Sequence, residues 1–173
     1  FVIFGYLQDI SFQKYGINLH NILQSLIWIG IFSPLIILVN YCIAGKGSNL
    51  YNYPQIRIRN WSPQSLFVNF TTWLIYLFAY EAFFRGLLLF SFYYTFGITT
   101  AIVVNLILYA VAHLPKGNKE IIGSIPFGLI LCIITLNTDS FLAAFLIHGI
   151  LATSYEFFSI KAHPEMSIKK QQI

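Results

Sequence analysis

One apolar stretch, from Leu66 to Phe96, limits the possible folds of this chain more than any other feature. Its only charged residues are Glu81 and Arg85. The stretch is longer than the roughly 20 residues that cross a lipid bilayer as a helix. The whole chain shares this character: 57% of its 173 residues are apolar, 9% are charged, and the mean hydropathy is +0.71. These values exclude an ordinary soluble domain and predict an all-α, polytopic transmembrane helix bundle.

We predict about five membrane spans in a single transmembrane domain. Ser62 as N-cap and Pro63 at the first helical position predict the start of a helix that continues to Phe96 and is broken at Gly97. A face of small residues, suited to close helix contact, is expected in the fourth span at Gly123, Ser124 and Gly128. The expected spans are 22–43, 63–96, 99–113, 121–136 and 140–160.

The basic residues predict the orientation of the spans. The turns around Gly97 and Asp139 contain no Lys or Arg. The positive-inside rule therefore places the loops 46–61 and 115–120 and the tail 161–173 in the cytoplasm, and we expect the tail to be unstructured. The basic residues of these segments are Lys46, Arg57, Arg59, Lys116, Lys119, Lys161, Lys169 and Lys170. They form no single patch with interleaved aromatic residues, so no nucleic-acid partner is expected.

The distances of Glu81 and His113 from the turn at Gly97 predict that both side chains lie at one depth in the membrane. Each is 16 residues from Gly97, which is roughly 24 Å along a helix. His148 is nine residues beyond Asp139, roughly 14 Å from its own turn and thus shallower by about two helical turns. The spacing therefore brings Glu81 and His113 together on adjacent antiparallel spans, and it only permits His148 to join them.

A glutamate and two histidines on separate helices suit the activation of a water molecule. The carboxylate accepts the proton of the water, and the imidazoles orient it or hold an oxyanion. Arg85 lies four residues after Glu81, on the same helix face, and would keep the carboxylate ionised. We expect no cofactor, but Glu81, His113 and His148 are the expected ligands if a divalent metal such as zinc binds. The structural alternative is a buried ion pair that fixes helix register, with both histidines in ordinary packing roles.

Three ordered motifs resemble those of the CPBP family of intramembrane proteases. They are Glu-x-x-Phe-Arg-Gly starting at Glu81, Tyr-x-x-x-His starting at Tyr109, and the separate His148. This family includes the type II CAAX prenyl endopeptidases and bacteriocin-processing proteins. The resemblance covers 62–160, the core that carries the protease-like motifs within the single domain 1–173.

Two positions depart from the motifs of that family. Tyr80 replaces the first of two adjacent glutamates, and Ala152 stands where an asparagine is expected. The first glutamate is usually the general base and the asparagine stabilises the oxyanion, so the resemblance implies a single-glutamate branch in which Glu81 serves as base. Tyr80 and Tyr109 are then candidates for contacting the substrate or the oxyanion. Glu120 is a candidate substitute base, or else a solvated loop charge.

The resemblance implies an intramembrane endopeptidase that hydrolyses a peptide bond of a membrane-anchored or prenylated protein, using a Glu-activated water assisted by two histidines. The alternative is a catalytically inactive, protease-like membrane module that binds or stabilises partner proteins. A small transporter is disfavoured because the chain has no pair of Gly/Pro-interrupted spans. The expected partners are the lipid bilayer and a membrane protein or lipidated peptide. The expected location is the bacterial plasma membrane.

Overall fold

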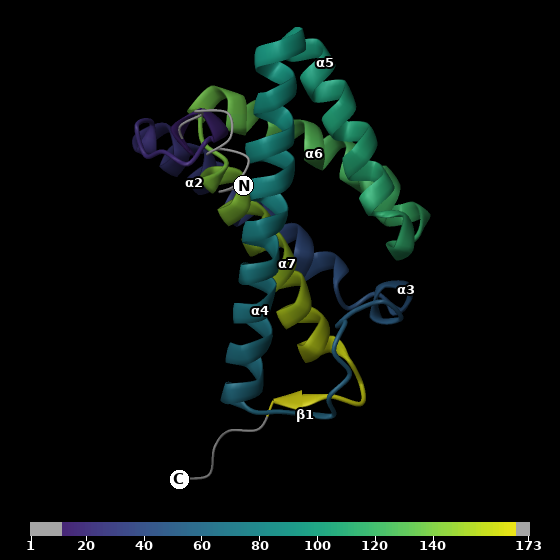
Figure 1. Cartoon of the computed structure of the whole chain (residues 1–173). Helices are drawn as coiled ribbons and strands as arrows, with labels where there is room; N and C mark the ends of the chain where they lie inside the picture. The colour runs from purple at the N-terminus through teal and green to yellow at the C-terminus, as the bar shows by residue number, and fades with distance from the viewer. Residues whose placement is uncertain (1–11, 169–173) are drawn as a thin grey trace. The chain divides into compact units, whose positions relative to one another are not determined.

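Helices make up nearly all of the regular structure (Figure 1). The computed structural model describes residues 12–168, which form two compact units, one of 12–29 with 78–146 and the other of 30–77 with 147–168. Besides the α-helices there are two 3-10 helices, η1 and η3, a π-helix, η2, and two short strands. The elements in chain order are η1 Phe12–Tyr15, α2 Ile22–Ile43, α3 Gly47–Leu50, β1 Asn60–Trp61, α4 Pro63–Glu81, η2 Ala82–Leu88, α5 Leu89–Ala112, η3 Leu114–Lys116, α6 Asn118–Thr138, α7 Leu142–Ala162 and β2 Ser167–Ile168.

The predicted class of fold, an all-α polytopic transmembrane protein, is confirmed. Within 12–168, four helical segments are long and apolar enough to cross a membrane: Ile22–Ile43, Pro63–Ala112, Asn118–Thr138 and Leu142–Ala162. The second of these is 50 residues long and contains a reversal of the chain, so the four segments correspond to about five passes. Helix α2 has the predicted bounds, whereas α6 begins three residues earlier than predicted.

Both ends predicted for the long second span are found. The backbone N–H of Ser65 donates to Ser62 Oγ at 3.1 Å, which is the predicted N-cap of the helix that begins at Pro63. At the other end Gly97 leaves the helical conformation, with φ of 81° and ψ of 173°, and the ribbon reverses direction within α5 (Figure 1). This backbone conformation is essentially restricted to glycine. The sequence therefore encodes the hairpin that sets the depth of residues in the helical arms before and after Gly97.

Replacing Gly97 by Ala is expected to lower the free energy of unfolding by about 1–3 kcal/mol, because a Cβ is strained at this φ and ψ. Space is not the cause, since a Cβ at Gly97 would meet no atom within 4 Å. The matched control is Gly123→Ala, a helical glycine that is equally open and whose replacement should stabilise the helix slightly. Denaturant titration in detergent micelles measures both changes. Equal stabilities of the two variants would contradict a strained turn at Gly97.

The first unit is held together by the packing of α5 on α6. The side chains of Leu89, Ala101 and Cys132 are buried at its centre, with Phe92, Ile102 and Leu136 packed against them. The π-helix η2 also contacts α5 and α6. As a result, the segment that follows Glu81 is enclosed by two later helices.

The second unit contains an ordered cap where a loop and an unstructured tail were predicted. In this cap β1 pairs in parallel with β2, placing Asn60 beside Ser167 and Trp61 beside Ile168, and Trp61 is fully buried. The prediction of an unstructured tail is therefore wrong for 161–168, because α7 continues to Ala162 and β2 gains ladder hydrogen bonds. The rest of the tail lies outside the described residues. The strand pairing puts the 46–61 loop and the C-terminal segment on one side, as the basic residues predicted.

Candidate active site

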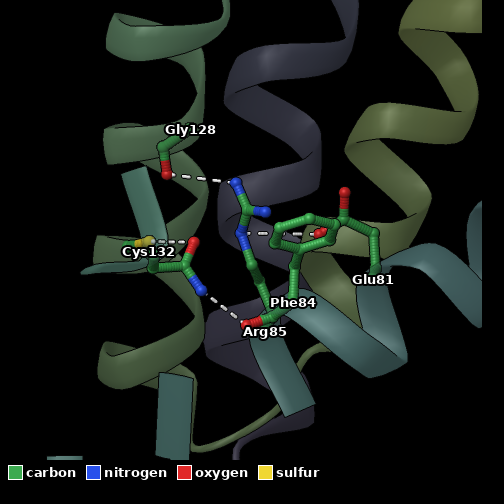
Figure 2. Close-up of polar contacts among 6 residues, drawn as sticks. Glu81, Phe84, Arg85, Gly128 and Cys132 are labelled. Atoms are coloured by element: carbon green, nitrogen blue, oxygen red, sulfur yellow. Dashed lines mark hydrogen bonds and ion pairs between the residues drawn. The ribbon is translucent and has the colours of Figure 1, made fainter. Parts of the chain in front are cut away.

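The π-helix η2 determines how the Glu81–Arg85 segment is placed. The sequence predicted a continuous α-helix, but the N–H of Leu89 reaches back five residues to the carbonyl of Phe84. That carbonyl also accepts a hydrogen bond from Asn105 Nδ2 of α5, at 2.6 Å, and Asn105 Oδ1 in turn lies 3.3 Å from Cys132 Sγ of α6 (Figure 2). Single-turn π-helices within α-helices are frequent at functional sites. Here the buried Asn105 of α5 stabilises the wider turn.

Glu81 and Arg85 form the predicted ion pair. Glu81 Oε2 lies 3.5 Å from Arg85 Nε, and both side chains are 0% exposed. The pair is therefore shielded from bulk solvent, and further polar partners must offset the large desolvation cost of two buried charges. In Figure 2 the guanidinium of Arg85 lies between the Glu81 carboxylate and the Gly128 carbonyl.

Arg85 has two further partners, one on each of the enclosing helices. Its Nη2 donates to the carbonyl of Gly128 on α6 at 3.3 Å, and its Cζ lies 4.2 Å from the centre of the Tyr109 ring on α5. A guanidinium over an aromatic face is attracted by the ring quadrupole, more strongly where water is excluded. Arg85 thus joins three helical segments, η2, α5 and α6, around one positive charge.

Gly128 allows this close packing because it lacks a side chain. A Cβ there would lie 3.0 Å from Tyr109 Cδ1 and 3.1 Å from Leu106 Cδ2. The predicted small-residue contact is therefore confirmed at Gly128. It is wrong at Gly123, where a Cβ would meet nothing within 4 Å. Ser124 is buried and donates within its own helix, to the carbonyl of Ile121 at 2.8 Å.

Tyr80 and His113 form a contact between the two helical arms of the hairpin. The ring of Tyr80 lies 6.4 Å from that of His113 and 5.7 Å from that of Tyr109. Since Tyr80 immediately precedes Glu81, this contact agrees with the predicted equal depth of Glu81 and His113. The more specific prediction, that one water molecule bridges Glu81 and His113, stays a prediction.

The hydrogen bond of His113 defines the protonation of its ring. His113 is 9% exposed and caps the C-terminus of α5, with Nδ1 2.8 Å from the carbonyl oxygen of Tyr109. A carbonyl can only accept a hydrogen bond, so Nδ1 carries the proton and, in the neutral ring, Nε2 holds the lone pair. A ring in this tautomer can accept a proton at Nε2 or ligate a metal there.

The remaining predicted residues occupy other positions. His148 is 8% exposed on α7 and belongs to the second unit, so its part in the site stays a prediction. Glu120 lies in the first turn of α6, where a carboxylate interacts favourably with the helix dipole. It is partly exposed, unlike the fully buried Glu81.

Two buried polar residues were missed in the sequence. Glu156 on α7 is 0% exposed and accepts the backbone N–H of Gln55 at 2.9 Å. It could have been found by the signal that identified Glu81, an acid within an apolar span. Asn105 is also 0% exposed. No motif marked it, since an asparagine within a span becomes informative only once its partners are known.

A metal centre is not assembled by the described side chains. Among residues 12–168, no group of three or more His, Cys, Asp or Glu side chains could hold a metal ion. Glu81, His113 and His148 as ligands of a divalent metal stay a prediction, as does the absence of any cofactor.

Comparison with known protein families accounts for the motifs. No curated protein and no solved structure matches the chain. A family model described as type II CAAX prenyl endopeptidase Rce1-like matches residues 61–154, which is more than half of the chain and nearly the range 62–160 in which the motifs were recognised. This range contains the buried ion pair, both histidines and the contact between Tyr80 and His113. The chain therefore belongs to the type II CAAX prenyl endopeptidase Rce1-like family of membrane proteins.

Proposed function

We propose that this protein is an intramembrane endopeptidase that hydrolyses a peptide bond of a prenylated or otherwise membrane-anchored protein. The family is one of CAAX-type intramembrane proteases, and the chain has helices that can cross a membrane. The observation that carries the proposal is the fully buried Glu81, ion-paired to a fully buried Arg85 within a span. Ionisable residues at such positions are costly and mark functional sites by default.

In the proposed reaction Glu81 is the general base. Its carboxylate takes a proton from a water molecule while the water oxygen attacks the scissile carbonyl carbon and forms a tetrahedral oxyanion. The C–N bond then breaks, and the proton held by Glu81 passes to the leaving amine nitrogen. Arg85 is a positioning residue: it holds the carboxylate through Nε and is itself held by Gly128 and Tyr109.

The histidines would stabilise the oxyanion and orient the water. The Nδ1 of His113 is bonded to the carbonyl of Tyr109, so we assign Nε2 as the ring atom that acts on the substrate. When protonated, Nε2 can donate a hydrogen bond to the oxyanion, a contribution that is strong in a water-excluded site. We assign the same role to His148. Tyr80, which contacts His113, is assigned to positioning the substrate.

A second function is favoured by one observation, the packing of Tyr80. Its ring lies 4.6 Å from the ring of Phe84 and 6.4 Å from that of His113, so an aromatic side chain fills the position at which related motifs place a second carboxylate. A site packed in this way suits a protease-like module that binds or stabilises membrane partners without cleaving them. The two functions predict opposite results in the experiment below.

The deciding experiment compares the wild-type protein with the double variant Tyr80→Glu/Ala152→Asn. This variant has the residues of the family motifs at both positions where the chain departs from them. Each is purified in detergent and incubated with a farnesylated peptide, and cleavage is followed by mass spectrometry. A catalytic wild type should cleave the peptide without the two substitutions. If only the double variant cleaves it, the binding module is the better description of this protein.

A further inference from the structure

A cavity of about 550 Å³ lies in the second unit, outside the candidate active site. Its lining comes from the end of α3, from the segment between α3 and β1 and from the segment after α7. These segments adjoin the ends of three membrane-crossing helices: α2 ends at Ile43, α4 begins at Pro63 and α7 ends at Ala162. The cavity is therefore at the level where the spans leave the hydrocarbon core and the lipid headgroups begin.

The charges in this cavity are predominantly positive. It is lined by Arg57, Arg59, His163 and Glu165, so two guanidinium groups face a single carboxylate. Among residues 12–168, neither Arg57 nor Arg59 forms an ion pair with an acid, and hence neither cavity arginine is neutralised by a described acid. A positive cavity of this kind attracts an anion.

The two arginines differ in how they are held. Both Nη atoms of Arg57 lie 3.2 Å from the Leu50 carbonyl; Nη2 also donates to the carbonyl of Tyr51 at 2.6 Å, and Nη1 lies 3.1 Å from His163 Nε2. This guanidinium is therefore fixed in place and its Nη groups are occupied by protein partners. Arg59 is anchored by its backbone, whose carbonyl accepts the N–H of Ser167 at 2.8 Å. Its guanidinium makes no hydrogen bond with the described residues and can turn toward a ligand.

Exposed apolar side chains occur in the same segment as the two arginines, although this segment is not part of a span. Tyr51 is 84% exposed, Ile56 43% and Ile58 37%. The two isoleucines alternate with Arg57 and Arg59 along the chain. Such a mixture of exposed apolar and basic residues is typical of a segment that lies in the headgroup layer, where tyrosine is also enriched.

We infer that this cavity binds the phosphate of an anionic phospholipid, such as phosphatidylglycerol, with Arg59 as the phosphate ligand and Arg57 as a fixed positive charge beside it. Guanidinium groups match the geometry of phosphate oxygens and are weakly hydrated, which suits a partly dehydrated headgroup site. Leu50, Tyr51 and Met166 line the cavity beside the charges and favour a lipid over a free anion, because a lipid also brings glycerol and acyl groups to them. This site is independent of the proposed proteolysis.

The inference is tested with the full chain by native mass spectrometry. The protein is purified in detergent and mixed with phosphatidylglycerol and phosphatidylcholine in equal amounts, and the retained lipids are counted. We expect one phosphatidylglycerol to be retained in preference to phosphatidylcholine. Arg59→Gln should weaken this binding about fivefold, since one basic residue near a membrane contributes about that factor. Glu165→Gln should strengthen it, because the substitution removes the only acid lining the cavity.

The matched control is Lys161→Gln. Lys161 is an exposed basic residue of the same unit that lies over the Phe157 ring and does not line the cavity, so its replacement should leave phosphatidylglycerol binding unchanged. The inference is overturned if Lys161→Gln weakens binding as much as Arg59→Gln, or if Arg59→Gln binds like the wild type. It is also overturned if equimolar inorganic phosphate or an acidic peptide displaces the lipid, since the cavity then belongs to a free anion or a protein partner.

Discussion

Replacing Glu81 by Gln is expected to abolish peptide cleavage, lowering the rate by about 10³-fold or more, because the amide cannot accept the proton of the attacking water. Gln removes the counter-charge of the buried Arg85 and so should lower the free energy of unfolding. Its carbonyl oxygen, the Gly128 carbonyl and the Tyr109 ring still contact the guanidinium, so we expect the purified variant to keep its helical content. Cleavage of a farnesylated peptide by the purified variant measures the loss, and circular dichroism checks the helical content. The control is Asp139→Asn, which removes a carboxylate from an exposed turn and should leave cleavage near the wild-type rate.

The same assay distinguishes the general base, Glu81, from the histidine that assists it. His113→Ala should reduce the rate by about 10²-fold without abolishing it, since the loss of one oxyanion donor typically has that effect. Substantial cleavage by Glu81→Gln would show that another group takes the proton, and the assignment of Glu81 as base would then be wrong.

Arg85→Ala is expected to destabilise the protein by about 3–5 kcal/mol. The substitution leaves the Glu81 carboxylate buried without its counter-charge, and an uncompensated buried charge is costly. It also removes the hydrogen bond to the Gly128 carbonyl and the contact with the Tyr109 ring. Because these contacts connect η2 with α5 and α6, the loss should appear as a lower midpoint of unfolding in a detergent titration.

A double variant identifies the cause of this loss. Adding Glu81→Gln to Arg85→Ala removes the uncompensated carboxylate and should recover part of the stability, whereas a loss due only to packing would not be recovered. Lys161→Ala, which removes an exposed cation from an aromatic ring, should cost less than about 1 kcal/mol. An unchanged unfolding midpoint for Arg85→Ala would mean that Arg85 reaches water or lipid headgroups instead of Glu81.

Local features of the sequence determined the bounds of α2, the start of α4 and the chain reversal at Gly97. The apolar run at 22–43 became α2 with the same bounds, Ser62 capped its helix, and Gly97 reversed the chain. Each of these depends on a residue and its neighbours within one or two helical turns. The four-residue spacing of Glu81 and Arg85 likewise led to the ion pair that was found, because both residues lie on one helix.

Only the tertiary structure decided what surrounds that pair. The wide π-turn at Ala82–Leu88 depends on an amide from Asn105, and Arg85 is held by a ring and a carbonyl from two later helices. The parallel pairing of β1 with β2 joins segments that are about a hundred residues apart, so neither strand could be recognised from its own two residues. The polar contacts of a buried side chain depend on which residues from distant parts of the sequence pack against it. The periodicity of residues along one helix carries no information about those partners.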